Sequence, residues 1–409
     1  MHLRKRPIRT LLFSTLYPSS IRPGHGIFVE NRLRELLKTG AVETKVIAPV
    51  PWFPFSANCF GSYARFAATP RFERHNGVEV HHPRYILPPK VGMNIAPYTI
   101  AAGALPTIKQ LLADGFEFDL IDAHYYYPDG VAAGIIAKKL GKPFVVTARG
   151  TDLNLIPQYA YPRRLIQKTA EQAYASIGVC KALMDKLADL GAERKKLYVF
   201  RNGVDLNKFK PEDRLLSRQK LELPTNCKIL LSVGNLVELK GHDIAIRSLT
   251  ELPDDTHLVI VGTGPEHKML ETLASSLQLA GRVSFAGQVA NTELRWWYSA
   301  ADTLVLCSSR EGWANVLLES MACGTPVIAS DISGTREVVS CDSAGLLMKD
   351  RTPKALSEAV INLLQRYPER TAVRQFAEKF SWDETSQAQQ RLFESIAFKD
   401  AQGNKLCAI

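Results

Sequence analysis

The sequence has no long apolar run and no paired cysteines. The first absence disfavours a membrane-spanning protein, and the second disfavours a disulfide-bonded or zinc-binding one. No run approaches the roughly 18 to 20 apolar residues that a membrane-spanning helix needs. The short apolar stretch near the N-terminus is interrupted by Arg9 and followed by no small-residue cleavage site, so we expect a buried first strand there rather than a signal peptide. The seven cysteines form no C-x-x-C pair. They predict reduced thiols in a cytoplasmic protein rather than disulfides or a zinc site.

Several catalytic and binding motifs are missing as well. The absence of D-x-D disfavours the metal-chelating transferases of the other major fold, and the absence of H-E-x-x-H and G-x-S-x-G disfavours metallohydrolases and serine hydrolases. Zinc fingers, aromatic RNP motifs and heptad repeats are also absent, which disfavours a nucleic-acid partner. We therefore expect no metal, no cofactor and no nucleic acid.

Acidic residues are scarce in the first half of the chain. Residues 1–200 hold 27 Lys and Arg against 15 Asp and Glu, a net charge of +12, whereas the remainder holds 24 against 26, a net charge of −2. The basic surface therefore belongs to the first half. Such a surface suits nucleic acid, an anionic membrane face or a phosphorylated substrate.

Short apolar runs alternate with amphipathic stretches along the chain, which is typical of parallel sheets covered by helices. The strand candidates are TLLFSTL, TKVIAP, VEVHH, FDLIDAHY, PFVVTA, SIGV and LYVF in the first half, and KILLSVGNL, HLVIVGTG, VSFAG, DTLVLCSS, PVIAS and AGLLM in the second. The pattern restarts after a polar stretch at 191–226. We expect an α/β protein with two doubly wound, Rossmann-like domains at 1–200 and 201–380 facing across a cleft, a last helix at 381–400 and a disordered tail at 401–409.

One stretch, SSREGWANVLLESMACGTPVIAS, predicts a helix that begins directly after a strand. Asn315 is the expected N-cap, Gly324 the residue just past the end, and Pro326 the stop. In open parallel sheets, ligands bind beyond the carboxyl ends of the strands. The unpaired N–H groups at the start of this helix therefore predict an anion site, above all for phosphate.

Two carboxylates, Glu311 and Glu319, bracket the start of that helix. At about 1.5 Å per residue their spacing of eight positions corresponds to roughly 12 Å, whereas the carboxylate pairs of glycoside hydrolases stand about 5 to 9.5 Å apart. The spacing therefore disfavours a hydrolase. It suits two groups that hold hydroxyls at opposite ends of one ligand, as in a nucleotide-sugar. The alternative is a solvated helix with two ordinary surface glutamates.

Neighbouring loops point the same way. Lys240 follows a strand and precedes a helix that begins near His242, where it could neutralise a diphosphate as a point charge, although a surface lysine is the alternative. VGTGP is a candidate phosphate or base loop. Because His267 stands where the dinucleotide fingerprint needs glycine, NAD or FAD is not supported.

A set of motifs in a fixed order is similar to that of the family-4 retaining glycosyltransferases, which have the GT-B fold. They are VFRNGVDLNKF, VGNLVELKG, IVGTGPE, VSFAGQV, LRWWYSAAD and the E-G-x6-E-S-M-A-C-G-T-P-V-I hallmark. FSWDETS resembles the family's last helix, which crosses back onto the first domain. The resemblance covers about residues 8–398 and implies an acceptor-side first domain, a nucleotide-sugar-binding second domain and a setting in bacterial surface polysaccharide synthesis.

The resemblance also implies roles for single residues. Glu319 is assigned to the ribose hydroxyls, Glu311 to the donor sugar's hydroxyls, and Lys240 to the diphosphate. The implied donor site as a whole comprises Gly26, Asn235, Lys240, Gly262, Gly312, Trp313, Ala314, Asn315 and Glu319. In such enzymes the acceptor attacks from the face that the leaving group vacates, the departing phosphate oxygen takes the proton, and catalysis is mainly charge stabilisation.

Two positions depart from the family pattern. Asn235 stands where many members have the arginine that pairs with the lysine on the diphosphate, and Arg149 stands where many have histidine. We hypothesise that Arg149 supplies the missing cation. The alternatives are that it holds an anionic acceptor or only pairs with Asp152. His124 follows a strand and could orient or deprotonate the acceptor, although a strand-end histidine is as often simply hydrogen-bonded in place. The predicted catalytic set is Glu311, Lys240, Arg149 and His124, with His124, Arg149 and Asp152 on the acceptor side.

A stretch from Pro51 to Phe72 is rich in aromatic residues and proline and includes Arg65 and Arg71. We expect a long irregular loop after the second strand that contacts a lipid-linked acceptor and the membrane interface. That contact would place the protein at the inner face of the plasma membrane. The alternative is a loop packed on its own domain.

The sequence therefore predicts a metal-independent hexosyltransferase that moves a sugar from a nucleotide-sugar to a saccharide or lipid-linked saccharide with retention of configuration. One rival is a nucleotide-sugar epimerase of the same fold, which the aromatic loop mildly disfavours. The other is a non-catalytic partner, which Asn235 and Arg149 suggest and the intact pair of Glu311 and Glu319 opposes. The sequence leaves open the donor's base and sugar, the acceptor and the oligomeric state.

Overall fold

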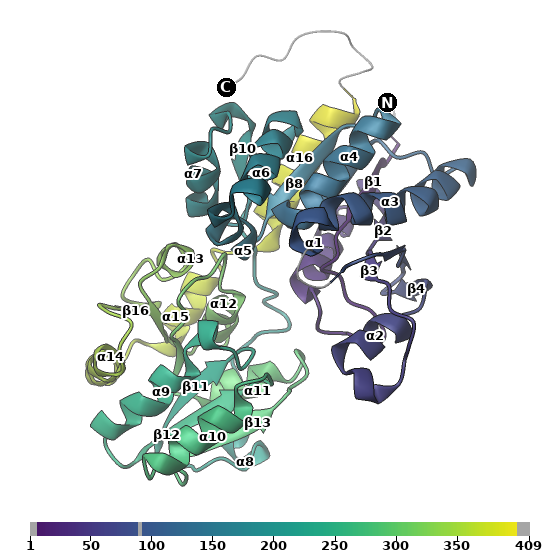
Figure 1. Cartoon of the computed structure of the whole chain (residues 1–409). Helices are drawn as coiled ribbons and strands as arrows, with labels where there is room; N and C mark the ends of the chain where they lie inside the picture. Colours follow the sequence, from purple (N-terminus) through teal and green to yellow (C-terminus); the bar gives the residue numbers. More distant parts are fainter. Residues whose placement is uncertain (1–5, 89–91, 399–409) are drawn as a thin grey trace. The chain divides into compact units, whose positions relative to one another are not determined.

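A computed structural model describes residues 6–88 and 92–398, and the chain divides into two compact units (Figure 1). Unit 1 consists of Met1–Arg201 and Asp383–Ile409, and unit 2 consists of Asn202–Trp382. The chain thus leaves unit 1 once and returns to it. The predicted tail at 401–409 lies outside the described residues.

The main sheet of unit 1 has the strand order β10-β9-β8-β7-β1-β2-β5-β4 and is parallel except for the β4–β5 pair at one edge. Its strands are β1 (Ile8–Phe13), β2 (Val42–Ile47), β4 (Phe72–His75), β5 (Val78–His81), β7 (Leu120–His124), β8 (Phe144–Ala148), β9 (Ala175–Gly178) and β10 (Leu197–Val199). A separate parallel pair is formed by β3 (Val50–Pro51) and β6 (Arg84–Tyr85). Strands β1, β7 and β8 are almost wholly buried, as expected of a sheet that is covered on both faces.

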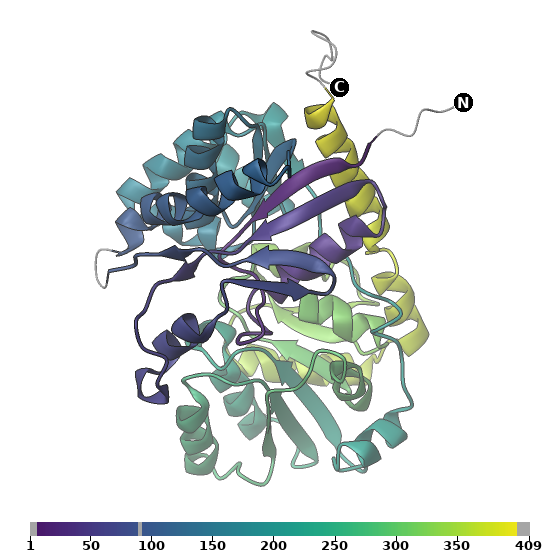
Figure 2. The ribbon, with the colours of Figure 1, turned by 90° about the vertical axis from the view of Figure 1, so that its right-hand side faces the viewer.

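The helices of unit 1 come from both ends of the chain. They are α1 (Ile27–Leu37), α2 (Ser62–Ala68), α3 (Gly92–Ala113), α4 (Val131–Leu140), α5 (Thr151–Asn154), α6 (Ala160–Gln172), α7 (Lys181–Asp189) and α16 (Trp382–Ala397). Helix α16, yellow in Figure 2, lies alongside the sheet that the purple strands begin. It buries Leu392, Phe393 and Ile396 in one apolar cluster with Ile8 and Val145. The expected return of the last helix to the first domain is therefore confirmed.

Unit 2 has a six-stranded parallel sheet in the order β13-β12-β11-β14-β15-β16. Its strands are β11 (Lys228–Val233), β12 (Thr256–Val261), β13 (Val283–Gly287), β14 (Thr303–Leu306), β15 (Val327–Ser330) and β16 (Gly345–Met348). Its helices are α8 (Arg214–Lys220), α9 (His242–Ser248), α10 (His267–Ser276), α11 (Leu294–Ala300), α12 (Asn315–Ala322), α13 (Ser333–Arg336), α14 (Pro353–Gln365) and α15 (Arg370–Ala377). Strands β11, β12 and β14 lie in the middle of one large apolar cluster with α9, α10 and α14.

Both sheets contain a point where the strand order reverses. In unit 1 it lies between β1 and β7, and in unit 2 between β11 and β14. From each point the following strands are added to the sheet first on one side and then on the other. Loops that leave the carboxyl ends of two such strands turn to opposite faces and leave a crevice for ligands. The predicted fold class, two Rossmann-like doubly wound domains, is confirmed.

One stretch is more regular than its composition suggests. The expected irregular loop at Pro51–Phe72 contains a short 3₁₀ helix (Asn58–Phe60) and α2. The ring of Phe53 lies 5.4 Å from that of Phe60 and 5.2 Å from that of Tyr63, centroid to centroid. These contacts give the segment a small core of its own. Within residues 6–88 and 92–398, no helix is both long enough and apolar enough to cross a bilayer.

Candidate active site

The reversal point of unit 2 brings Lys240 and Glu311 together. Lys240 follows β11 and Glu311 follows β14, and the ammonium Nζ donates to Glu311 Oε1 at 2.6 Å. The hydroxyl of Ser308 donates to the same oxygen at 2.7 Å. Both charged side chains are partly buried, which strengthens their attraction over that of a surface pair. A cation and a carboxylate thus meet at the crevice where the fold is expected to bind a ligand.

The backbone around Gly241 explains why Lys240 reaches this place. Gly241 has φ 67° and separates the 3₁₀ helix Glu238–Lys240 from α9. A β-carbon there would lie 2.3 Å from the carbonyl oxygen of Cys307, so only glycine lets the two loops touch. The N–H of Ser309 donates to the carbonyl of Leu239 at 2.9 Å and holds the loops in register.

Helix α12 begins at Asn315 without a side-chain cap. The N-cap position is Ala314 rather than Asn315, and no side chain accepts from the first turn. The expectation that Asn315 is the N-cap is therefore wrong, because its amide oxygen instead accepts from Asn202 Nδ2 at 3.2 Å. Two N–H groups of the first turn donate to backbone carbonyls instead, that of Asn315 to Trp313 and that of Leu317 to Ala314, each at 3.1 Å. The start of α12 still carries the positive end of the helix dipole, which favours an anion.

The other end of α12 has the predicted geometry. Gly324 has φ 76°, its N–H donates to the carbonyl of Met321 at 2.8 Å, and the N–H of Thr325 donates to that of Ser320 at 3.0 Å. This pair of bonds is a Schellman motif, for which glycine is favoured. The motif ends the helix just before β15, so the position of α12 relative to the sheet is set at both ends.

Glu319 lies just over one turn into α12 and is half-buried. The phenol of Tyr298 donates to Glu319 Oε2 at 2.8 Å. Burial raises the pKa of the Glu319 carboxyl, while the Tyr298 hydrogen bond and the charge of Lys208 oppose that rise. A carboxylate held in this way can accept further hydrogen bonds from a pair of ligand hydroxyls.

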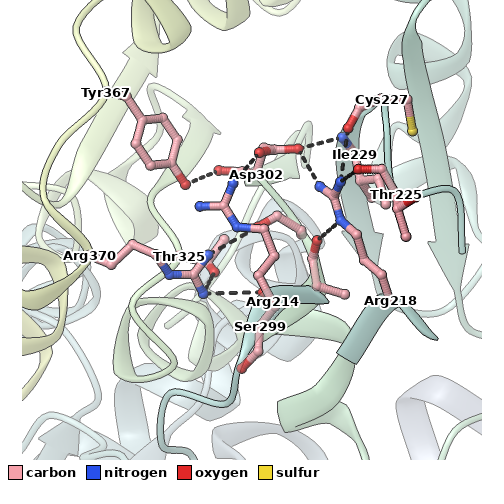
Figure 3. A network of polar contacts seen from close by, with 12 residues as sticks. Arg214, Arg218, Thr225, Cys227, Ile229, Ser299, Asp302, Thr325, Tyr367 and Arg370 are labelled. Carbon is pink, nitrogen blue, oxygen red and sulfur yellow. Dashed lines mark hydrogen bonds and ion pairs between the residues drawn. The ribbon is translucent and has the colours of Figure 1, made fainter. Parts of the chain in front are cut away.

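A polar network around Thr325 and Arg370 holds this part of the site in place (Figure 3). The hydroxyl of Thr325 donates to the carbonyl of Tyr298 at 2.7 Å, and Arg370 Nη2 donates to the same hydroxyl and to the carbonyls of Ser299 and Cys323. The ends of α11 and α12 are thus joined through one guanidinium. Cations at helix C-termini are favoured by the helix dipole.

The remaining predicted donor residues lie on neighbouring loops of unit 2. Trp313 and Ala314 are buried, and the Trp313 ring lies 6.1 Å from that of Phe380. Asn235 is exposed, and its carbonyl accepts from His242 Nε2 at 3.2 Å. Gly262 packs on the strand-end loop of β11, where a β-carbon would lie 1.9 Å from the carbonyl oxygen of Gly234.

Gly334 was missed by the sequence reasoning. It lies in α13, which follows β15, and a β-carbon there would be 2.5 Å from the carbonyl oxygen of Glu311 and 2.9 Å from that of Gly312. This close contact packs α13 directly against the backbone of the Glu311 loop. The available signal was a glycine four positions after the end of the buried strand PVIAS.

Unit 1 brings His124 and Arg149 together at the ends of β7 and β8. Arg149 Nη2 lies 2.5 Å from His124 Nδ1, and His124 Nε2 lies 3.2 Å from Asp122 Oδ2. Burial, the first cause, lowers the pKa of His124 to about 4, so the imidazole is neutral at pH 7. Nδ1 then accepts from Arg149, and Nε2–H donates to Asp122. The Arg149 guanidinium also lies over the ring of Phe28, 5.4 Å from its centroid.

Asp152 acts on backbone rather than on a side chain. Its buried carboxylate accepts from the N–H groups of Tyr126 at 2.7 Å, Gly150 at 2.7 Å and Arg149 at 3.1 Å. These bonds tie the loops after β7 and β8 to each other. Gly26 is the N-cap of α1 at φ 70°, and a β-carbon there would lie 2.3 Å from the carbonyl oxygen of Leu16.

A buried polar chain runs from this cluster into the last helix, and the sequence reasoning missed it. Gln389 of α16 donates through Nε2 to Asp122 Oδ2 at 3.2 Å and accepts through Oε1 from Arg32 Nε at 2.9 Å. Arg32 also donates to the carbonyl of Phe200 at 2.9 Å. Its side chain is 1% exposed, and burial lowers its pKa to about 10. The helix that closes the unit thus contacts the partner of His124.

The structure therefore gathers the predicted residues into two groups. Unit 1 holds Gly26, His124, Arg149 and Asp152, and unit 2 holds the donor residues from Asn235 to Glu319. Among residues 6–88 and 92–398, no three His, Cys, Asp or Glu side chains are grouped so that they could hold a metal ion.

Comparison with known proteins agrees with this arrangement. The family described as Glycosyltransferase Family 4 matches residues 22–208, and the family described as Glycosyl transferases group 1 matches residues 213–380. A protein of Bacillus subtilis (strain 168), provisionally named the teichuronic acid biosynthesis glycosyltransferase TuaC, is 32% identical over 362 residues, which cover 86% of this chain and 88% of that protein.

Two solved structures share the fold at low sequence identity. Sucrose-phosphate synthase from Thermosynechococcus elongatus has a TM-score of 0.78 at 20% identity, covering 96% of this chain and 99% of that one. Anabaena HepE in complex with UDP-glucose has a TM-score of 0.70 at 19% identity, covering 95% of this chain and 99% of that one. The chain therefore belongs to glycosyltransferase family 4 and is a glycosyltransferase of the GT-B fold.

Proposed function

We propose that the protein transfers a hexose from a nucleotide-sugar to a saccharide or lipid-linked saccharide in polysaccharide biosynthesis, with retention of configuration and without a metal. The contact between Lys240 and Glu311 beside the uncapped start of α12 carries this proposal. It places a cation, a carboxylate and a helix N-terminus at one crevice, which suits a diphosphate joined to a sugar. The likeness to TuaC, named for teichuronic acid biosynthesis, supports the polysaccharide setting.

In the proposed donor site, each group takes one part of the ligand. Lys240 and the first N–H groups of α12 bind the diphosphate, Glu311 accepts from sugar hydroxyls, and Glu319 accepts from the ribose. The Lys240 ammonium already lies 2.6 Å from Glu311. When the donor binds, the phosphate would contact the ammonium and the sugar hydroxyls would donate to the carboxylate of this ion pair. HepE was solved with UDP-glucose, so UDP-sugars are the first donors to test.

Catalysis in this proposal consists of stabilising the leaving group. The bond from the anomeric carbon to the phosphate oxygen breaks, and the acceptor oxygen bonds to the same carbon on the face that the phosphate leaves. The acceptor's proton passes to the departing phosphate oxygen. Lys240 and the α12 N-terminus hold the negative charge that develops on the diphosphate, which is the term that commonly contributes most.

The groups of unit 1 serve the reaction through Arg149. Neutral His124 orients the Arg149 guanidinium without cancelling its charge, and Asp152 holds the backbone from which Arg149 extends. We assign Arg149 to an anionic group of the donor diphosphate. In this assignment His124 and Asp152 are positioning residues.

The aromatic segment at 52–63 supports a membrane contact as part of the proposal. Trp52 is 56% exposed and Phe55 is 55% exposed, and Arg65 and Arg71 nearby are exposed as well. Aromatic rings with cationic neighbours suit an interface with anionic lipid. A lipid-linked acceptor would be met at such a surface.

A thermal-shift titration with UDP, GDP, ADP and their sugars tests the donor site. A ligand that binds the native state raises the melting temperature by mass action. We expect one nucleotide to stabilise the wild type and to lose its effect in Glu319→Ala. The control is Glu358→Ala, which removes an exposed carboxylate of α14 in the same unit.

Three other outcomes would count against the proposal. No stabilisation by any nucleotide would reject the donor site. An equal loss in Glu319→Ala and Glu358→Ala would trace the effect to general charge. Nucleotide binding without turnover on any acceptor would favour the non-catalytic rival.

A further inference from the structure

A basic pocket of about 830 Å³ opens in unit 1 at the amino ends of β8, β9 and β10, the opposite end of the sheet from His124 and Arg149. It is lined where α4 joins β8, where α6 joins β9, and at the start of β10. Phe144, which begins β8, lines the pocket, whereas Arg149 follows the end of that strand. Five residues of strand span about 16 Å. The pocket is therefore separate from the groups around His124.

The lining of this pocket is strongly cationic. Its thirteen residues include Lys138, Lys142, Lys195 and Lys196 and contain no Asp or Glu. Two carboxylates pair with lining lysines, and neither of them lines the pocket. Glu117 lies 3.4 Å from Lys142. Glu193 lies 2.7 Å from Lys195, and both of those side chains are more than half exposed. Exposed pairs of this kind are weak and exchange easily for another anion.

One of the lysines, Lys196, forms no ion pair within residues 6–88 and 92–398. Lys196 Nζ donates to the carbonyls of Glu171 at 2.7 Å and Ala173 at 3.2 Å, which end α6. Both acceptors are neutral backbone groups, so they hold the ammonium in place and leave its charge intact. A preformed cation of this sort costs little to organise when an anion arrives.

The walls between the lysines are aromatic and apolar. Phe144, Tyr174 and Tyr198 line the pocket, and both tyrosines pack partly against the apolar cluster beneath the sheet. Flat rings with a polar edge suit the apolar faces of sugar rings, and ammonium groups suit carboxylates or phosphates on them. The volume falls within the range of about 300 to 1,000 Å³ that is usual for small-ligand sites.

We propose that this pocket binds an acidic saccharide, a short glycan segment that carries carboxylate or phosphate groups, away from the site of transfer. The proposal rests on the proposed function, since a polysaccharide-building transferase meets such chains as acceptor or product. The pocket holds the chain at a second point while its end is extended.

The test measures binding of tetragalacturonate to the full-length protein by calorimetry, with neutral maltotetraose as the comparison sugar. The variant Lys138→Gln with Lys195→Gln removes two exposed lining ammonium groups. We expect its affinity for tetragalacturonate to fall about tenfold, since two charge-assisted contacts are lost. The matched control, Lys38→Gln with Lys109→Gln, removes the same charge from exposed sites of unit 1 outside the pocket and is expected to bind as the wild type does.

Hydrogen exchange locates the ligand in the same experiment. Protection on adding tetragalacturonate is expected at residues 138–144 and 172–174, and protection confined to residues 149–154 would overturn the proposal. Equal weakening by the two double variants would overturn it too. So would loss of binding to phosphatidylglycerol vesicles in the pocket variant with tetragalacturonate binding unchanged, because the pocket would then serve a lipid headgroup.

The UDP thermal shift on the same preparations separates this proposal from the proposed function. A UDP shift without tetragalacturonate binding rejects the pocket and leaves the transferase standing. Tetragalacturonate binding at the pocket without any nucleotide shift retains the pocket and rejects the donor site.

Discussion

His124 and Arg149 are joined by a bond that orients the arginine but leaves its charge in place. A carboxylate in the position of His124 would form an ion pair with Arg149. That pair would weaken the electrostatic attraction between Arg149 and any other anion. Burial lowers the pKa of His124 to about 4, so the ring accepts from Arg149 as a neutral base. Burial above all, and the nearby charge of Arg32, also lower the pKa of Arg149, while the charges of Asp122 and Asp152 oppose that shift. A further negative charge near the guanidinium would stabilise its charged form.

This reasoning yields a prediction for Arg149. The Arg149→Ala variant should bind the stabilising nucleotide about tenfold more weakly, because a charge-assisted contact to phosphate is lost. Arg149→Lys should recover only part of the affinity, since a lysine keeps the charge but not the planar fork. Calorimetry with the free nucleotide measures both, and Arg163→Ala on the exposed face of α6 is the control.

A different result would reassign the residue. If Arg149→Ala left nucleotide affinity unchanged and raised only the KM of the acceptor, the guanidinium would hold an anionic acceptor instead. If neither changed, Arg149 would be a structural partner of the loops after β7 and β8.

Several elements of unit 2 are joined through a single buried residue, Asp302 (Figure 3). It accepts from Arg218 Nη2 at 2.8 Å, from Arg214 Nη1 at 2.9 Å and from the N–H of Ile229 at 2.7 Å. The backbone carbonyl of Asp302 accepts from the hydroxyl of Tyr367 at 2.8 Å. The same residue therefore connects α8, the start of β11 and the segment between α14 and α15.

The Asp302→Asn variant should lose roughly 3 kcal/mol of unfolding free energy, because the buried guanidinium of Arg218 would lose its counter-charge. Urea denaturation at pH 7 measures the loss. Asp254→Asn is the matched control, since the Asp254 side chain is fully exposed in its pair with Arg282 and the substitution should change the unfolding free energy far less. Equal, small losses in the two variants would show that the network is unimportant for stability.

Elements with a strong local pattern could be predicted from the sequence. All of the proposed strands are present, because each buried strand is a short run of apolar residues that ends at a turn. The end of α12 was predicted correctly as well, since the Cys-Gly-Thr-Pro segment specifies a Schellman motif by itself. Local chemistry decides these features, so a single sequence contains them.

Features that depend on distant residues could not be predicted. The sequence predicts Asn315 as the N-cap of α12, yet the structure has Ala314 there, and the Asn315 amide accepts from Asn202, 113 positions away. Gln389 meets Asp122 across 267 positions. Helix α3 includes Pro97 and Pro106, which argue locally against a helix, and it forms because tertiary packing outweighs that preference. Nothing in the sequence near these residues records such contacts.

On the scale of the whole molecule, charge and exposed aromatic area occur in the same unit. The net charge of +12 belongs to residues 1–200, and that stretch also contains Trp52, Phe55, Phe60 and Tyr63, each between 41% and 56% exposed. Large exposed apolar side chains beside basic ones mark a surface that meets a partner. The near-neutral remainder of the chain has no comparable excess of charge.

We predict that the protein binds vesicles that contain phosphatidylglycerol and binds neutral phosphatidylcholine vesicles much more weakly. Replacing Arg65 and Arg71 by Gln should weaken sedimentation with anionic vesicles several-fold, because each basic residue near the surface contributes about 1 kcal/mol. Replacing Trp52 and Phe55 by Ser should weaken it through lost apolar contact.

The control replaces two exposed apolar residues of unit 2, Leu215 and Leu216, by Ser, and should bind as the wild type does. Equal binding to neutral and anionic vesicles would reject the electrostatic part of the proposal. Binding that survives both replacements in unit 1 would place the lipid contact elsewhere.

The return of α16 to unit 1 has a consequence for folding during synthesis on the ribosome. The ribosome makes residues 202–382 between the two parts of unit 1. At roughly 5 to 20 residues per second this interval lasts on the order of 10 to 40 s. Throughout it, the apolar side chains that pack on Leu392, Phe393 and Ile396 remain uncovered. Unit 1 is therefore the first unit to emerge from the ribosome and the last to be completed. Until α16 is released, the nascent chain exposes an apolar surface of the kind that chaperones bind.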